Sequence, residues 1–297
     1  MFSKKKIAFV GSSLITLLHA KRLAKDFDCY IFDKSAANGG AWAGVYQGNR
    51  LLPNYNNLIC PASSLEEKFI QAISDELQQY SQSITIRRTA LNLLTNYVPE
   101  SYILGNFSEI VNQIINETKI HINKTSIFEL SIFDDFVEVN SECFDYVFFN
   151  QNFSFHKLHI NGQPIEVNSE IIISKHVTVF FDKELGDLDY TEDFDNVFDR
   201  ASFYYPDRRV FVARIRKASK DLSIKQIVKN SEWLSKNSNF IESVHIRYYE
   251  NDKIQREQLG TLSLQLINKP ATIIETRQFV NSYIQLQNYE NNLKDLI

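Results

Sequence analysis

The 297-residue chain has few of the residues that break regular structure, and it lacks the cysteine patterns of small secreted domains. Its nine glycines and six prolines are few for this length, so each of them marks a position where the backbone requires it. The three cysteines, Cys29, Cys60 and Cys143, are odd in number and far apart, which excludes a disulfide framework and a cysteine zinc site. We therefore expect a reducing compartment, the cytoplasm.

An excess of one charge and a long apolar run are also lacking. The 32 basic and 36 acidic residues leave a net charge of −4, so no basic field attracts nucleic acid and we expect no such partner. Lys4 to Leu18 resembles a signal peptide, but Gly11 to Ser13 interrupt its apolar run and a helical pattern follows. No stretch approaches the roughly 20 apolar residues of a membrane span. We expect neither a leader nor a span.

What is present is the composition of a globular protein, with 44% hydrophobic, 13% aromatic and 23% charged residues. These values exclude wholesale disorder, and the length suggests one large domain or two intertwined ones. The oligomeric state cannot be predicted from these values.

The first 33 residues have the pattern of a strand–turn–helix–strand unit. Residues 6–10 form a short apolar run ended by Gly11, which predicts a buried strand. From Leu14 the apolar residues recur at helical spacing, and residues 29–32 form a second apolar run that ends at Asp33. The unit has the size of a βαβ motif.

The turn after the first strand is where a dinucleotide-binding fingerprint belongs. The start of the following helix offers free N–H groups to a pyrophosphate. Only the first glycine of GxGxxG is present, as Gly11, while Ser13 and Thr16 stand at the other two positions. Asp33 follows Gly11 by 22 positions, where we expect an exposed carboxylate that accepts hydrogen bonds from ribose hydroxyls.

A second glycine pair, Gly39-Gly40, lies just beyond Asp33. With these residues the sequence resembles the superfamily of flavin-dependent amine oxidases and UDP-galactopyranose mutases. That superfamily has a glycine-rich turn, an acidic residue at the end of the second strand and a Gly-Gly loop over the phosphates. The resemblance in the order of parts extends over about residues 5–150.

The resemblance implies bound FAD, with NAD(P) or no cofactor as the alternatives. It places the backbone of Thr125 to Ile127 near the adenine and Trp42 near a flavin or substrate. The predicted cofactor-binding residues are Gly11, Ser12, Ser13, Leu14, Asp33, Lys34, Gly39, Gly40, Trp42 and Ile127. The C-terminal Gly-Asp segment of the superfamily is missing, since residues 273–293 contain none. A flavin would therefore bind weakly, in another pose or not at all.

Four residues are candidates for substrate binding. Arg214 and Arg216 share one face of a predicted strand at 209–217, where two guanidinium groups can clamp a diphosphate. The alternative is a solvated face balanced by the acidic segment 182–199, which we expect to be a solvated loop. By resemblance Asn57 and Cys60 line the active cleft; the alternative for Cys60 is an ordinary buried thiol.

Catalytic residues cannot be assigned, and no metal site is predicted. His156 and His159 are the histidines that invite a metal-binding interpretation. On a strand, however, they face opposite sides, and no cysteine or carboxylate pattern accompanies them.

Weaker patterns predict the remaining elements. Ser64 resembles a capping-box residue that opens a helix to about Tyr80. Period-two patterns predict strands from about residue 126 onwards, including one at 262–267, and a final helix covers 278–296.

The sequence therefore predicts an α/β fold. A Rossmann-like FAD/NAD(P)-binding domain would comprise residues 1–150 and 255–297, and an inserted antiparallel α+β substrate domain would comprise residues 151–254. The predicted function is that of a FAD-dependent oxidoreductase or flavin-dependent mutase acting on a small molecule or a nucleotide sugar. The alternative is a non-catalytic binding protein on the same fold, as the Rab GDP-dissociation inhibitors are.

Overall fold

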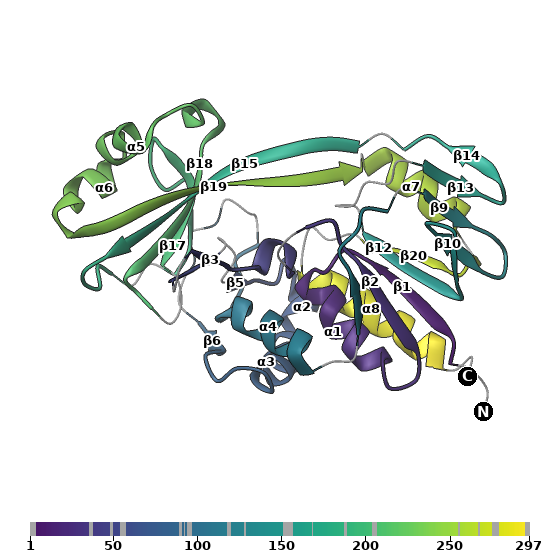
Figure 1. The fold of residues 1–297 in the computed structure, drawn as a ribbon. Helices are drawn as coiled ribbons and strands as arrows, with labels where there is room; N and C mark the ends of the chain where they lie inside the picture. Colours follow the sequence, from purple (N-terminus) through teal and green to yellow (C-terminus); the bar gives the residue numbers. More distant parts are fainter. Residues whose placement is uncertain are drawn as a thin grey trace. The chain divides into compact units, whose positions relative to one another are not determined.

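The computed structural model describes most of the chain. The described residues are 4–35, 38–47, 50–53, 58–88, 91, 93, 97–117, 120–127, 129–150, 157–167, 169–186, 189–203, 207–254, 256–266, 268–274 and 279–294. The chain divides into two compact units (Figure 1). The first comprises Met1–Gly40, Val111–Ile172 and Asn251–Ile297, and the second comprises Ala41–Ile110 and Ile173–Glu250. The domain boundaries predicted from the sequence differ in where they place residues 41–110, and they stay a prediction.

The first unit is built on a five-stranded sheet in the order β20-β12-β1-β2-β8. Its strands are β1 (Lys6–Val10), β2 (Asp28–Phe32), β8 (His121–Asn123), β12 (Tyr146–Asn150) and β20 (Ala271–Ile274). Every neighbouring pair is parallel. The strand order reverses at β1, next to β12, as in doubly wound dinucleotide-binding folds. The predicted α/β, Rossmann-like fold class is thereby confirmed.

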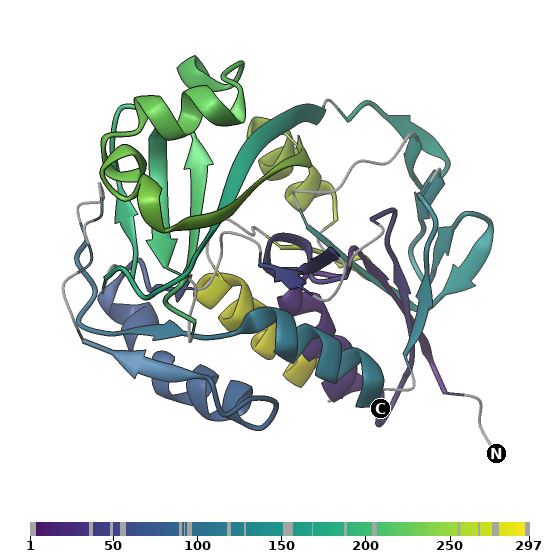
Figure 2. The same ribbon diagram turned by 60° about the vertical axis from the view of Figure 1, so that its left-hand side comes forward.

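Two helices of this unit lie side by side, α1 (Leu14–Leu23) and α8 (Phe279–Lys294) (Figure 2). A buried polar cluster joins them: His19 contacts Glu290, and Arg22 donates hydrogen bonds to Glu290 and to the Tyr283 hydroxyl. The Glu290 carboxylate thereby bridges His19 and Arg22 of α1 to α8. The predicted final helix is thus confirmed.

A second sheet of the first unit has the order β11-β10-β9-β13-β14. Its strands are β9 (Glu129–Ile132), β10 (Val137–Val139), β11 (Glu142–Phe144), β13 (Lys157–Ile160) and β14 (Gln163–Ile165). Leu130 and Val137 from this sheet share one hydrophobic core with Val10 and Phe32 of the parallel sheet. The period-two pattern after residue 126 is confirmed for these strands.

The predicted strand at 262–267 is wrong, because α7 (Arg256–Gln265) covers most of it. Leu262, Leu264 and Leu266 alternate as in a strand. Leu262 in the helix and Leu266 directly after it are joined by a hydrogen bond from the Leu266 N–H to the Leu262 carbonyl, and both are buried, whereas Leu264 is exposed. Three leucines are too few to distinguish the two-residue period of a strand from the 3.6-residue period of a helix.

The second unit contains a sheet in the order β16-β17-β18-β15-β19. Its strands are β15 (Ser169–Phe181), β16 (Thr191–Glu192), β17 (Phe198–Phe203), β18 (Val210–Ile215) and β19 (Ile241–Ile254), of which β15 and β19 continue into the first unit. The pairs β16–β17, β17–β18 and β15–β18 are antiparallel. The predicted solvated loop at 182–199 is therefore wrong in part, because it contains β16 and the start of β17.

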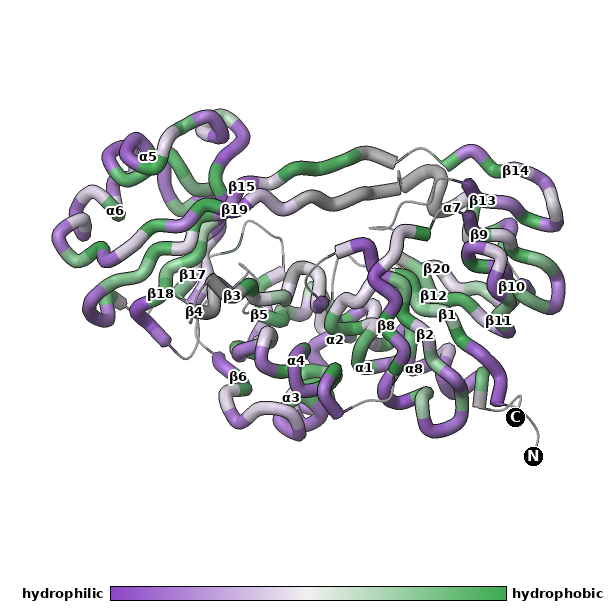
Figure 3. The backbone as a smooth tube through the Cα atoms, in the orientation of Figure 1, coloured by the Kyte–Doolittle hydropathy of each residue, from purple (hydrophilic) through white to green (hydrophobic). Residues whose placement is uncertain are grey.

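One face of this antiparallel sheet carries the core of the second unit. Phe181, Phe203 and Phe211 pack there around Trp233, with ring centroids 4.9–5.7 Å from the indole. The helices that cover this face are α5 (Ile224–Asn230) and α6 (Glu232–Lys236), flanked by the 3₁₀ turns η2 (Lys217–Ser219) and η3 (Ser238–Phe240). The apolar residues concentrate in the strands of both units, as Figure 3 shows.

The rest of the second unit comes from residues 41–110. Its strands are β3 (Val45–Gln47), β4 (Arg50–Leu52), β5 (Leu58–Ile59), β6 (Thr85–Arg87) and β7 (Tyr102–Leu104), and its helices are η1 (Gly40–Trp42), α2 (Ser64–Glu67), α3 (Ile70–Gln78) and the start of α4 (Phe107–Glu117). The helix predicted from Ser64 is capped instead by Ser63, whose hydroxyl accepts from the Glu66 N–H. The helix is also broken in two between Glu67 and Ile70.

Of the helices described here, none combines the length and the apolar character that a membrane crossing requires.

Candidate functional site

The turn after β1 has the conformation that the glycine motif predicts. Gly11 has a φ of +86°, a left-handed value that favours glycine, and its N–H donates to the Phe32 carbonyl over 2.7 Å. Ser13 is the N-cap of α1, and its hydroxyl accepts from the Thr16 N–H at 3.2 Å. The same hydroxyl lies 2.9 Å from the Thr16 hydroxyl. Both substituted positions of the GxGxxG pattern therefore serve as the helix cap.

Asp33 lies at the end of β2 and is bonded to this turn. Its Oδ2 accepts hydrogen bonds from the Ser12 N–H at 3.2 Å and from the Ser12 hydroxyl, and its Oδ1 accepts from the Ser35 N–H at 2.8 Å. The carboxylate was predicted to be exposed, but the residue is only 5% exposed. The prediction fails because Ser12 is itself buried and places its hydroxyl on Asp33.

The Gly39-Gly40 pair closes over the same turn. Gly39 has a φ of +104° and Gly40 one of +55°. The Gly39 N–H donates to the Ser12 carbonyl at 2.7 Å and approaches the Ser12 hydroxyl at 3.3 Å, and an isolated β-bridge joins Ser13 to Gly39. We call the set Gly11, Ser12, Ser13, Asp33 and Gly39 the phosphate-loop knot. It lies at the carboxyl edge of the parallel sheet, where such folds bind ligands.

Lys124 is a member of this edge that the sequence analysis missed. It follows β8, and its Nζ donates to the Ser35 carbonyl at 2.8 Å and to the Asn38 side chain. Burial lowers the pKa of Lys124, and the negative charge of Asp33 opposes that shift. Its signal in the sequence is its place: it directly precedes Thr125 to Ile127, the segment whose backbone the resemblance places near the adenine.

The other predicted cofactor-binding residues lie outside the knot. Lys34 is exposed, Leu14 is buried at the start of α1, and the Ile127 side chain lies in the core of the first unit. Gly40 begins η1. Trp42 belongs to the second unit, where its ring meets Phe107 edge-on at 4.6 Å. Their roles toward a cofactor stay predictions.

Cys60, predicted to line the substrate cleft, is half-buried with a free thiol. It packs against the apolar cluster of Leu91, Tyr102 and Leu104. Burial, together with Glu67, Glu66 and Glu192, raises the pKa of Cys60 to about 12, so the thiol is neutral at physiological pH. This environment suits packing rather than nucleophilic chemistry. Asn57 lies outside the described residues.

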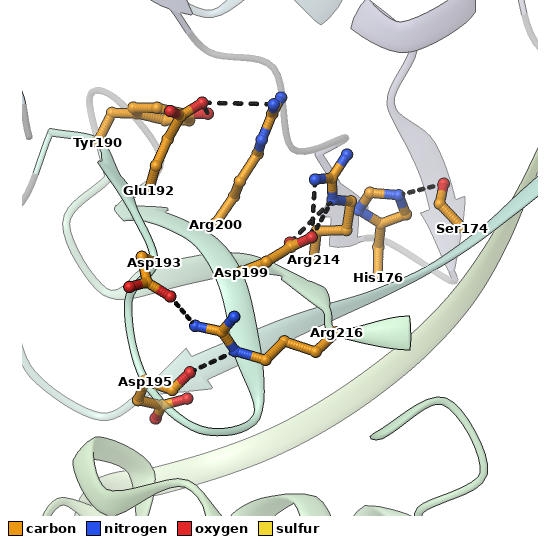
Figure 4. A network of polar contacts seen from close by, with 10 residues as sticks. All are labelled: Ser174, His176, Tyr190, Glu192, Asp193, Asp195, Asp199, Arg200, Arg214 and Arg216. Atoms are coloured by element: carbon orange, nitrogen blue, oxygen red, sulfur yellow. Dashed lines mark hydrogen bonds and ion pairs between the residues drawn. The ribbon is translucent and has the colours of Figure 1, made fainter. Parts of the chain in front are cut away.

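Arg214 and Arg216 bind separate partners, as Figure 4 shows. Arg214 makes a two-pronged contact with Asp199, at 2.8 and 2.7 Å. Arg216 donates to the Asp195 carbonyl at 2.7 Å and to the Asp193 carboxylate. The aspartates of the acidic segment thus hold both guanidinium groups, and the predicted diphosphate clamp would require a ligand to compete with them.

Within the described ranges no three His, Cys, Asp or Glu side chains gather as a metal site would require. His159 lies 3.1 Å from Glu129 across β13 and β9. His156 lies outside the described residues.

The parallel sheet and the helices beside it define a Rossmann-type fold, and comparisons with solved structures agree. Reduced UDP-galactopyranose mutase matches with a TM-score of 0.64 and 10% identity over 99% of this chain and 94% of that chain. Putrescine oxidase bound to putrescine matches with a TM-score of 0.63 and 8% identity over 98% of this chain and 99% of that chain. A protein named as a protoporphyrinogen oxidase from Exiguobacterium sp. 255-15 matches with a TM-score of 0.61 and 10% identity over 98% of this chain and 100% of that chain.

At these identities the comparisons establish the fold, and the predicted resemblance is confirmed at that level. No protein-family model matches the chain, and no curated protein matches its sequence.

Proposed function

We propose that the protein is a flavoprotein that binds FAD and acts as an oxidoreductase or a mutase on a small molecule. The phosphate-loop knot carries this proposal. A left-handed glycine, a helix start and a carboxylate at the end of the second strand are the parts with which doubly wound folds hold a pyrophosphate and a ribose. The matching folds of an oxidase and a mutase support the same function.

The first unit has the types of group that bind an adenine dinucleotide. The start of α1 presents backbone N–H groups, and Gly39 and Gly40 place a second stretch of side-chain-free backbone beside it. Asp33 would accept ribose hydroxyls once its Ser12 contact yields. A bound flavin would supply the redox chemistry, and the protein would hold and orient it.

A nucleotide sugar is the finer proposal for the substrate. The support is the fold of the mutase and the gathering of arginines on the antiparallel sheet, since guanidinium groups bind phosphate oxygens in pairs. Arg214, Arg216 and Cys60 are the described residues proposed for substrate contact. No general base is proposed.

One observation favours a second function, a binding protein without a cofactor. The hydrogen-bonding groups of the knot satisfy one another, because Asp33 accepts three hydrogen bonds from its own turn and Ser13 caps Thr16. A loop closed in this way is stable without a ligand.

The visible absorption spectrum of the purified protein, with mass spectrometry of what heat releases, separates these functions. Flavin absorbance and released FAD support the first proposal, and released NAD(P) redirects it to a nicotinamide enzyme. A colourless protein that also fails to bind added FAD contradicts the flavoprotein and supports the binding protein.

A further inference from the structure

The face of the antiparallel sheet opposite the aromatic core carries a row of polar residues across five strands. Cross-strand pairing places Glu192 beside Arg200, Arg200 beside Arg214, and Arg214 beside His176. Residues opposite one another on neighbouring strands face the same side of a sheet. Figure 4 shows these side chains together with Asp199.

Strands β15 and β19 extend the row. Because Val244 and Ile246 pack on the aromatic core, the alternation of a strand turns Arg247 to the opposite face, toward His176. Thr178 follows His176 on the same face of β15, beyond which lie the buried side chains Phe180 and Val212. We call Thr178, Arg200, Arg214 and Arg247 the oxyanion row.

Two buried polar atoms of this row have no hydrogen-bond partner among the residues that the structure describes. Thr178 is 1% exposed, and the two atoms are its Oγ1 and the buried Nε of Arg247. Among the residues that the structure describes, Arg247 donates one hydrogen bond, from its Nη2 to the Pro53 carbonyl. Buried donors without partners cost free energy, so a native fold that keeps two of them on one face of a sheet requires an explanation.

The charges of the row do not balance. Asp199 pairs with Arg214 and Glu192 with Arg200, at 3.3 Å for the latter pair, while Arg247 bonds only a carbonyl among the described residues. His176 is neutral, because burial and then the neighbouring arginines Arg214, Arg247 and Arg200 lower its pKa to about 3. Among the described residues one positive charge of the row is left without a carboxylate, which matches one negative charge on a ligand.

We propose that the oxyanion row binds the anionic group of the substrate, a carboxylate or a phosphate, with Arg247 and Thr178 as the residues that contact it. Arg200 and Arg214 border the position and are partly exposed, so the anion approaches from their side. This inference rests on the proposed function in taking the ligand to be the flavoprotein's substrate, and it narrows that substrate to an acid. It also moves the anion contact from Arg216 to Arg247.

Two variants test the row in the full-length protein as purified. Binding of inorganic phosphate and of benzoate is measured by calorimetry at constant ionic strength. Arg247→Gln removes the unmatched charge and should weaken binding of the preferred anion at least tenfold. Thr178→Val removes the unpaired hydroxyl; it should weaken binding about threefold and raise the melting temperature of the ligand-free protein, since an unsatisfied buried group is lost.

Arg209→Gln is the matched control. Arg209 is an exposed arginine that pairs with Asp207 just before β18, so the variant makes the same change of net charge outside the row. Binding should be unchanged in it. Equal losses in Arg247→Gln and Arg209→Gln would overturn the proposal, as would wild-type protein that binds neither anion. Preference for phosphate or for benzoate tells which kind of acid the site takes.

Flavin absorbance of the same samples separates this proposal from the function on which it rests. If the protein is colourless and its variants bind the anions in the expected order, the flavoprotein proposal is rejected and the oxyanion-row proposal is supported. If the protein is yellow and binds neither anion, the flavoprotein proposal is supported and the oxyanion-row proposal is rejected.

Discussion

The phosphate-loop knot of the first unit and the oxyanion row of the second treat buried polar groups in opposite ways. In the knot, Asp33 accepts three hydrogen bonds and the Ser12 hydroxyl and carbonyl are both used. In the row, Thr178 Oγ1 and Arg247 Nε are buried and have no partner in the described part of the chain. A closed knot fixes a loop whether or not a ligand is bound. An open row costs stability until a ligand satisfies it.

The largest effect that tests this contrast is expected at Asp33. Asp33→Ala leaves the Ser12 N–H and hydroxyl and the Ser35 N–H without their acceptor, at about 1–3 kcal/mol for a buried donor that stays unsatisfied. We expect the free energy of unfolding to fall by about 2–4 kcal/mol and the retained dinucleotide to fall with it. Urea unfolding and cofactor content measure the two effects.

Asp28→Ala is the control for this variant. Asp28 begins the same strand and its side chain is exposed, so its loss should change stability by less than about 0.5 kcal/mol. Similar losses in both variants would show that Asp33 is no more than a surface carboxylate, and the contrast between knot and row would not hold. Unchanged cofactor content in Asp33→Ala would reject its proposed contact with the ribose.

The knot could be predicted from the sequence because its parts are local. Gly11, Asp33 and Gly39 follow two short apolar strands, and parallel strands bring such ends to one edge. The burial of Asp33 could not be predicted, because it depends on where one serine hydroxyl points. The strand predicted at 262–267 was wrong for a related reason, because a short alternating leucine pattern fits both a strand and one face of a helix.

The oxyanion row could not be predicted, because its residues come from segments far apart in the sequence. Thr178, Arg200 and Arg247 meet only through the strand order of the antiparallel sheet. Period two correctly indicated that Arg214 faces away from the core. The acidic segment 182–199 was the alternative source of counter-charge, and Asp199 and Asp193 supply it. Period two did not indicate which carboxylate of that segment pairs with which arginine.

The second largest expected effect is the pH dependence of stability that His176 causes, and it tests the charge count of the oxyanion row. Because the pKa of His176 in the folded protein is about 3, below the ordinary value of 6.5, the unfolded chain binds one more proton between these values. Stability should therefore fall as the pH is lowered through this window, by up to about 1.4 kcal/mol per pH unit. Urea unfolding between pH 7 and about pH 5 measures the slope.

In His176→Gln the part of that slope due to His176 should vanish, since a glutamine can keep a hydrogen bond to the Ser174 hydroxyl without titrating. His121→Gln, which changes an exposed histidine of β8, is the control and should keep the slope of the wild type. A slope that is the same in all three proteins would mean that His176 is not held neutral, and the charge count of the oxyanion row would then be wrong.

The smallest effect separates the two arginines that the sequence grouped together. Each of Arg214→Ala and Arg216→Ala removes one partly exposed ion pair, so each should cost about 1 kcal/mol of stability or less. Only Arg214 lies beside His176, where after burial its charge is the largest cause of the lowered pKa. An NMR titration of the His176 ring should therefore show a raised pKa in Arg214→Ala, with Asp199 left unpaired nearby, and no change in Arg216→Ala. If both variants moved the pKa alike, the two arginines would form one cluster after all, and the clamp predicted from the sequence would regain its support over the row that contains Arg247.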